Sequence, residues 1–120
     1  MRAFLVSEVR RVMNTAIWSW EGWRAAWATE KSLRQWSLVN LISAGLTFAV
    51  EMTPAERALI LAMGLMILMA ELVNSAIEEA VDYISTDRNP RAKKAKDCGS
   101  AAVAVAAIAG GVVWLVVLIG

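Results

Sequence analysis

The C-terminal stretch, residues 98–120, contains 23 residues and no charged side chain. At about 1.5 Å per residue, a helix of this length measures about 34 Å and can cross a hydrocarbon core of about 30 Å. Residues 35–50 also lack charge, and residues 58–77 carry only Glu71. Hydrophobic residues make up 58% of the 120 residues, more than a soluble domain of this size buries. The sequence therefore predicts an all-α membrane protein, and a soluble helical bundle is the disfavoured alternative.

Capping signals place the helices. Thr53-Pro54-Ala55-Glu56 has the pattern of a capping box with proline at the first helical position, and Asn89-Pro90 combines an N-cap with the same proline. We expect transmembrane helices at about 32–51, 54–86 and 90–119. All of them belong to a single membrane domain, 1–120.

The segment at about 4–28 has a different pattern, because apolar residues recur there at steps of three or four. The apolar face consists of Leu5, Val9, Val12, Ala16, Trp20, Trp23 and Trp27. Charged residues fall on the other faces, which predicts an amphipathic helix lying in the membrane interface. Trp18 shares a face with Arg11 and Glu21, where it can stack on a planar ligand or lie among lipid headgroups.

The distribution of lysine and arginine predicts the orientation. Six precede the first apolar span, five lie between the second and third, and only Arg57 lies in the remaining loop. By the positive-inside rule, the N-terminus and the 87–96 loop face the cytoplasm and the C-terminus faces the outside. The net charge of +1 does not indicate a surface that binds nucleic acid. The chain has no histidine and a single cysteine.

The most informative polar residues share one helix face, because they are spaced by three and four: Glu71, Asn74, Ser75, Glu78 and Asp82. A carboxylate at membrane depth is costly, so Glu71 is more often functional than a structural charge paired with a neighbouring cation. Glu78 and Glu30 offer two hard oxygen ligands, which suits Mg²⁺ when substrate phosphates complete its shell.

A basic cluster opens the third span, with Arg91, Lys93, Lys94 and Lys96. Cations beside a helix N-terminus suit a phosphate group, and contact with anionic lipid is the alternative. The residues alone thus predict a small membrane protein with a polar, phosphate-handling site at its cytoplasmic side.

Three blocks of the chain resemble the small prokaryotic diacylglycerol kinase family. They are Arg24-Ala-Ala-Trp27 with Glu30 and Arg34-Gln35; Glu71-x-x-Asn74-Ser-Ala-Ile-Glu78-x-x-x-Asp82; and Ala95-Lys96-Asp97-x-Gly99-Ser100-Ala-Ala-Val103. The resemblance implies a homotrimer in the bacterial inner membrane, each protomer with a surface helix and three transmembrane helices. It also implies transfer of the γ-phosphate of MgATP to the primary hydroxyl of diacylglycerol, giving phosphatidic acid, at sites shared between protomers. Undecaprenol kinase is the sister alternative; a small pore or transporter subunit, which needs no magnesium site, is a distant one.

The same resemblance assigns roles to individual residues. Glu71 corresponds to the general base, and Glu30 and Glu78 to the Mg²⁺ ligands. The expected nucleotide contacts, besides these two glutamates, are Arg11, Trp18, Asn74, Arg88, Asn89, Lys96 and Asp97. The expected lipid contacts, besides Glu71, are Arg24, Ala25, Ala26, Trp27, Ser32, Arg34, Gln35, Ser100 and Trp114. The sequence departs from the family at two places. Trp18 stands where the family commonly has tyrosine, and Arg88-Asn89 stands where it commonly has the pair Tyr-His.

Overall fold

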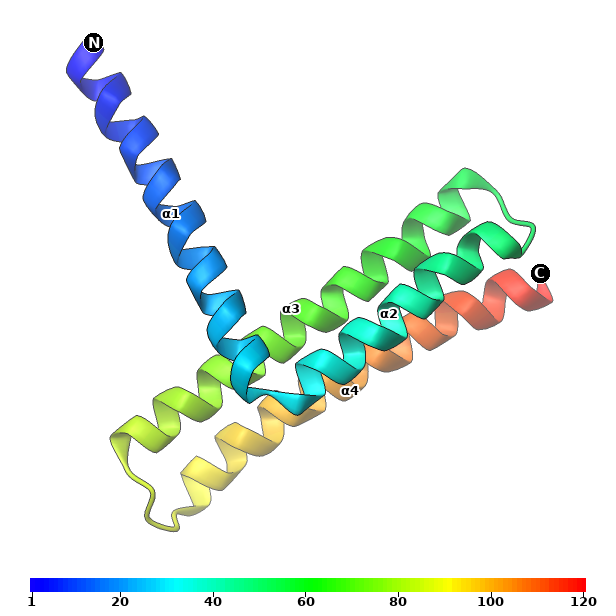
Figure 1. Ribbon diagram of the computed structural model, residues 1–120. Helices are drawn as coiled ribbons and strands as arrows, with labels where there is room; N and C mark the ends of the chain where they lie inside the picture. The colour runs from blue at the N-terminus through cyan, green and yellow to red at the C-terminus, as the bar shows by residue number, and fades with distance from the viewer. The chain divides into compact units, whose positions relative to one another are not determined.

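The computed structural model describes residues 1–120 and contains four helices and no strand. The helices are α1 (Arg2–Thr29), α2 (Lys31–Ala49), α3 (Pro54–Ile84) and α4 (Pro90–Ile119), as labelled in Figure 1. The predicted all-α class and the four helices are confirmed. The predicted ranges 32–51 and 54–86 each extend two residues past the observed ends of α2 and α3. The chain divides into two compact units, Met1–Glu30 and Lys31–Gly120.

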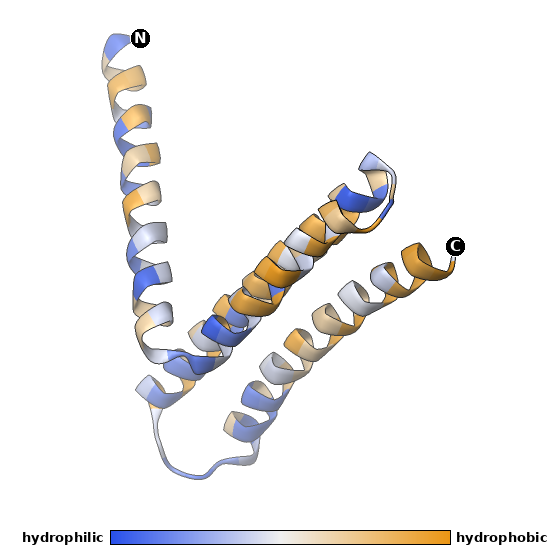
Figure 2. Cartoon of the chain, turned by 45° about the vertical axis from the view of Figure 1, so that its right-hand side comes forward, coloured by the Kyte–Doolittle hydropathy of each residue, from blue (hydrophilic) through white to orange (hydrophobic).

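The first unit is α1, which has no buried residue. Within the helix, Arg11 Nη2 lies 2.5 Å from Glu8 Oε2, and the rings of Trp23 and Trp27 stack with their centroids 5.8 Å apart. Figure 2 shows hydrophilic and hydrophobic residues on different sides of α1. This two-sided pattern is the basis for expecting an interfacial helix, and the location of α1 in a membrane stays a prediction.

In the second unit, α3 is the central helix and packs against both α2 and α4, whereas the backbones of α2 and α4 do not approach each other. Side-chain hydrogen bonds join the three helices. Asn40 Nδ2 on α2 donates to the carbonyl oxygen of Gly64 on α3 at 2.9 Å. Trp114 Nε1 on α4 donates to Ser43 Oγ on α2 at 2.7 Å, so one long side chain links the two outer helices.

Both predicted caps are present. Thr53 Oγ1 accepts a hydrogen bond from the backbone N–H of Glu56 at 3.2 Å and donates to Glu56 Oε1 at 3.0 Å. Asn89 Oδ1 accepts from the backbone N–H of Arg91 at 2.8 Å at the start of α4. These bonds satisfy N–H groups that the first turn of a helix leaves without partners, which is why α3 and α4 begin where they do.

Two helices, α3 and α4, are long and apolar enough to cross a membrane. Only 22% and 6% of their most apolar windows are buried within the chain, whereas the core helix of a soluble protein is mostly buried. This exposure of long apolar helices indicates membrane association. The helix α2 has only 19 residues, and Lys31, Arg34 and Asn40 lower its hydropathy, so that it falls short of the same criterion. The third membrane span stays a prediction.

Candidate active site

The polar face predicted for the second span lies on α3, and its burial falls steadily toward the α3–α4 loop. Glu71 and Ser75 retain only 4% and 8% of their exposure, Asn74 and Glu78 are half-buried, and Asp82 is exposed. A carboxylate as buried as Glu71 is rare in proteins. The face thus leads from a buried acid to acids that water and a nucleotide can reach.

Asn74 and Glu78 interact one helical turn apart. Nδ2 of Asn74 donates to Oε1 of Glu78 at 3.3 Å. Oδ1 of Asn74 is buried and has no hydrogen-bond partner within the chain. A buried acceptor without a partner costs free energy, so this oxygen is an unusual feature of the polar face.

The basic start of α4 is joined to the acidic face of α3 by one ion pair. Lys96 Nζ lies 2.6 Å from Asp82 Oδ1, although the two residues are 14 positions apart. This hydrogen bond, assisted by the charges of Asp82 and Glu78, raises the pKa of Lys96 above its usual 10.5 against the opposing effect of desolvation. The ammonium group therefore stays charged at physiological pH and lies at the open end of the acidic face.

A second ion pair stays within α4. Lys93 Nζ lies 2.5 Å from Asp97 Oδ2, one turn away on the exposed surface. The hydrogen bond and the charge of Asp97 raise the pKa of Lys93. Asp97, which we expected at the nucleotide, thus has a local partner, and exposed pairs of this kind contribute little to stability.

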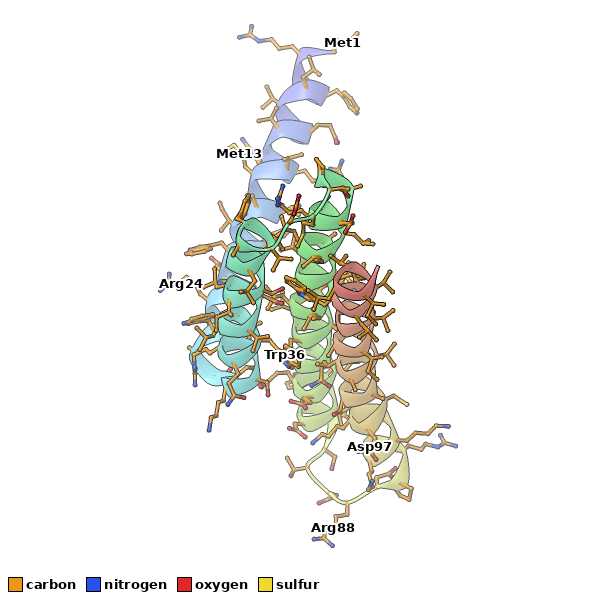
Figure 3. The ribbon with its side chains drawn as sticks, turned by 90° about the vertical axis from the view of Figure 1, so that its right-hand side faces the viewer. Met1, Met13, Arg24, Trp36, Arg88 and Asp97 are labelled. Carbon is orange, nitrogen blue, oxygen red and sulfur yellow. The ribbon has the colours of Figure 1, made fainter.

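A cleft of about 610 Å³ lies beside the α3–α4 loop. Of the predicted nucleotide residues, Arg88, Asn89 and Lys96 line it, together with Asp82 and Lys93. In Figure 3, Arg88 lies at the tip of this loop and Asp97 lies on the first turns of α4. The cleft therefore combines three cations with the end of the acidic face, which suits a polyphosphate.

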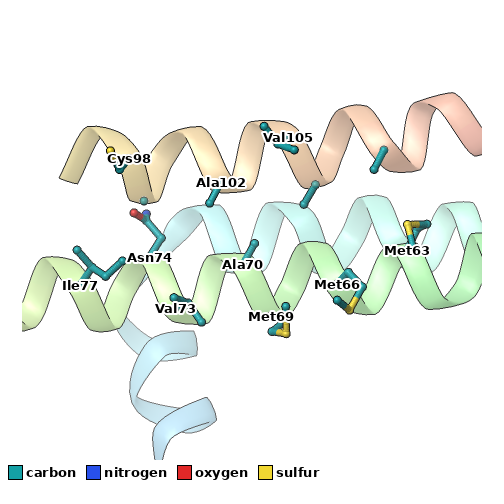
Figure 4. Close-up of a pocket in the computed structure, with 13 residues that line it drawn as sticks. Met63, Met66, Met69, Ala70, Val73, Asn74, Ile77, Cys98, Ala102 and Val105 are labelled. Carbon is teal, nitrogen blue, oxygen red and sulfur yellow. The ribbon is translucent and has the colours of Figure 1, made fainter. Parts of the chain in front are cut away.

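An apolar groove of about 490 Å³ runs between α3 and α4. Its walls carry Met63, Met66 and Met69 from α3 and small residues from α4, and Asn74 lies at one end (Figure 4). Methionine side chains are flexible and adapt to apolar partners of varied shape. The groove thus begins at the polar face and continues along the apolar part of the two helices.

Several predicted site residues belong to α1 and are described within that unit alone. Arg11 pairs with Glu8, Trp18 is 64% exposed, and Trp27 stacks on Trp23. Glu30 caps the end of α1, where its backbone N–H donates to the carbonyl oxygen of Ala26 at 2.7 Å. Arg24 and Ala25 are exposed and Ala26 is half-buried. The partnership of Glu30 with Glu78 at a metal ion stays a prediction.

The remaining predicted lipid contacts lie on α2 and α4. Ser32, Arg34 and Gln35 are exposed on the first turn of α2, and Ser100 is exposed on α4. Trp114 is half-buried and bonded to Ser43. At about 1.5 Å per residue, Trp114 lies roughly 20 Å along α4 from Ser100, so it can contact only the tail of a lipid whose headgroup is near Ser100.

The donors near Glu78 fit a magnesium ion that arrives with a nucleotide. The carboxylate of Glu78 offers hard oxygen atoms, which Mg²⁺ prefers, and the amide of Asn74 donates a hydrogen bond to one of them. No group of three or more acidic or cysteine side chains gathers anywhere in the chain. Mg²⁺ that binds beside phosphates usually uses one or two carboxylates rather than a complete protein cage.

Sequence reasoning placed Asp82 on the acidic face and Gly99 in the block Ala95–Val103 without a role at the site, and it did not single out Ser43. Asp82 carried a usable signal, because it continues the three-and-four spacing of the acidic face. Gly99 packs against Asn74, and Ser43 binds Trp114; these contacts join different helices. No local pattern in the sequence predicts these contacts.

The fold and the site define a small helical membrane-associated protein with an acidic helix face beside a basic helix start. The family model described as prokaryotic diacylglycerol kinase matches residues 13–118. The chain is 40% identical over 112 residues to a diacylglycerol kinase of Pseudomonas aeruginosa, covering 93% of this chain and 91% of the relative. It is 33% identical over 108 residues to that of Escherichia coli K12, covering 90% and 88%. The chain belongs to the prokaryotic diacylglycerol kinase family, which is a family of enzymes.

Proposed function

We propose that this chain transfers the γ-phosphate of MgATP to the primary hydroxyl of diacylglycerol and produces phosphatidic acid. Family membership supports the reaction. The observation that carries the proposal is the α3 face, on which the buried Glu71 is followed by Asn74 and Glu78 and then by the Asp82–Lys96 pair from α4. One helix thus connects an acid at lipid depth with charges that can hold a nucleotide.

Glu71 acts in this proposal as the general base. It accepts the proton of the lipid hydroxyl as the hydroxyl oxygen attacks the γ-phosphorus and the bond to the β-phosphate oxygen breaks. Positioning and charge neutralisation account for most of the catalysis of phosphoryl transfer. The lipid alcohol stays in the membrane interface, so a base held at the same depth can reach its hydroxyl group.

Glu78 and Glu30 would hold the Mg²⁺ of MgATP, which when bound would supply positive charge at the phosphates. Lys96 adds a cation at the phosphates, and Asn74 and Asp97 organise the same region. Arg11, Trp18, Arg88 and Asn89 contact the nucleotide farther from the reacting phosphate. The cleft beside the α3–α4 loop and its cationic lining support this arrangement.

The lipid lies along the apolar surface, with its headgroup near Glu71. Arg24 to Trp27, Ser32, Arg34, Gln35 and Ser100 contact the polar part of the lipid, and Trp114 contacts its tail. The protein is a homotrimer of the bacterial inner membrane, with α2 as a third span. The large apolar side chains exposed along α2 and α4 support surroundings of lipid and further copies of the chain.

The test is an assay of the purified protein in mixed micelles with labelled ATP, Mg²⁺ and one lipid alcohol at a time. We expect labelled phosphatidic acid from diacylglycerol and much less product from undecaprenol. A preference for undecaprenol would show that the chain is an undecaprenol kinase instead. Absence of any labelled lipid, with protein that is folded by circular dichroism, would overturn it and favour a pore or transporter subunit.

A further inference from the structure

Gly99 on α4 faces Asn74, a residue of the polar face of α3. Gly99 is buried, and a Cβ atom added to it would overlap Oδ1 of Asn74. Figure 4 shows the Asn74 side chain pointing from α3 toward α4, next to Cys98. The missing side chain of Gly99 thus makes the space that the Asn74 carboxamide occupies.

This contact fixes the direction in which Asn74 donates its hydrogen bond. With Oδ1 against Gly99 and buried, Nδ2 points to Glu78 and donates to Oε1 at 3.3 Å. If the carboxamide rotated, Glu78 would lose this donor. Glu78 would then have a different orientation and charge environment.

The backbone itself has room for a methyl group at Gly99. The Asn74 Cα atom would lie 3.6 Å from the added Cβ, which is an ordinary van der Waals distance. The atoms that must move belong to the end of the Asn74 side chain, which can rotate without shifting either helix. A methyl group at Gly99 therefore displaces the carboxamide while leaving the packing of α3 and α4 in place.

From these contacts we infer that Gly99 is a positioning residue for catalysis, which acts through Asn74 on the Glu78 carboxylate. The inference rests on the proposed function, because it assigns Glu78 to the MgATP site. Gly99 does not touch a substrate; its role is to leave the space that holds Asn74. The alternative is that Gly99 serves only the close packing of α3 and α4.

Gly99→Ala is the test variant, and Gly110→Ala is the matched packing control on the same helix. A Cβ at Gly110 would meet two apolar side chains, Ile67 Cδ1 at 3.4 Å and Met63 Cβ at 4.0 Å, and no polar atom. We expect Gly99→Ala to lower kcat/KM for MgATP at least about tenfold, the effect of losing one hydrogen bond to a charged group. The KM for diacylglycerol should change less than twofold, and Gly110→Ala should keep both values.

Two further measurements separate positioning from packing. Calorimetric titration with magnesium and a non-hydrolysable ATP analogue should show weaker binding to Gly99→Ala than to the wild type and Gly110→Ala. In a double-mutant cycle, Gly99→Ala should have almost no additional effect once Asn74 is replaced by alanine, because the group that it displaces is absent. Equal effects of Gly99→Ala in the two backgrounds would overturn the inference.

Folding is followed by far-UV circular dichroism and gel filtration in detergent. If Gly99→Ala alone fails to fold, the Asn74→Ala/Gly99→Ala variant should fold, because the overlap is relieved; failure of both would make Gly99 a packing residue and overturn the inference. Wild-type activity in Gly99→Ala would also overturn it. Loss of the proposed function is a separate outcome, since in that case the wild-type protein forms no phosphatidic acid.

Discussion

At the scale of single residues, Glu71 and Glu78 share a helix face but differ in what surrounds them. Glu71 is 4% exposed, whereas Glu78 is half-buried and accepts a hydrogen bond from Asn74. A buried carboxylate and a solvated one suit different tasks, proton transfer for the first and cation binding for the second. Isosteric replacement by glutamine tests each task without changing the shape of the side chain.

Glu71→Gln should lower kcat by roughly 10²–10⁴-fold, because the amide cannot accept the proton of the lipid hydroxyl. Stability should hold or rise, since a buried charge is removed from a membrane helix. Binding of MgATP should be nearly unchanged. Steady-state kinetics together with thermal unfolding followed by circular dichroism would check both expectations. Near-normal turnover in the variant would make Glu71 a structural charge instead of the base.

Glu78→Gln should raise the Mg²⁺ concentration needed for half-maximal activity at least about tenfold, since even groups that only support a metal ligand contribute that much. Glu79→Gln is the matched control, because Glu79 is adjacent in sequence, exposed and on another face of α3. Activity is measured as a function of free Mg²⁺ for both variants. An unchanged magnesium dependence in Glu78→Gln would remove this residue from the metal site.

At the scale of helices, the Lys96–Asp82 pair determines how the basic start of α4 meets the end of α3. The raised pKa of Lys96 determines the direction in which the stability contributed by this pair changes with pH. Any stabilisation from the pair is fully present below the usual lysine pKa of 10.5 and is lost as the pH rises through the higher value in the folded protein. The pair is partly exposed, so its contribution to stability is small and its main effect is on position.

Lys96→Ala should raise the KM for MgATP about tenfold or more, because a hydrogen bond from an ammonium group to phosphate is lost. The KM for diacylglycerol should change little, since the lipid approaches from the bilayer. Lys94→Ala is the control, as Lys94 belongs to the same basic cluster but is exposed and does not line the cleft. A higher KM for the lipid with an unchanged KM for MgATP would contradict the assignment of Lys96.

The helix starts and the acidic face could be predicted from the sequence because both depend on local patterns. The caps at Thr53 and Asn89 need only residues within one turn, and the face of Glu71 and Glu78 follows from helical periodicity. The contact of Gly99 with Asn74 could not be predicted, because it depends on how α3 and α4 are aligned along their lengths. That alignment is set by the 85–89 loop and by packing between helices. The pairing of Lys96 with Asp82 depends on the same alignment.

At the scale of the whole molecule, the two connecting loops lie at opposite ends of α3, a helix of 31 residues. If α3 crosses the bilayer, residues 50–53 and 85–89 are on different sides. The excess of lysine and arginine around the second loop predicts that it is cytoplasmic. Residue 31, at the start of α2, then lies on the cytoplasmic side only if α2 also spans the membrane.

Single cysteines introduced into a Cys98→Ser background test this topology. In intact cells, a membrane-impermeant maleimide should label Met52→Cys, and it should label Thr86→Cys and Ser7→Cys only after the membrane is opened. Labelling of Ser7→Cys but not of Thr86→Cys in intact cells would exclude α2 as a span. Labelling of both Thr86→Cys and Ser7→Cys, but not of Met52→Cys, would reverse the predicted orientation of the whole chain.

The hydrogen bond between Trp114 and Ser43 also has a consequence for how the protein is made. Synthesis proceeds from the N-terminus, so α2 and α3 are complete well before residue 114 leaves the ribosome. Until then, the Ser43 hydroxyl oxygen lacks this indole N–H donor. This hydrogen bond between the two outer helices can therefore form only after Trp114 has been made, and a nascent chain released before Trp114 lacks it.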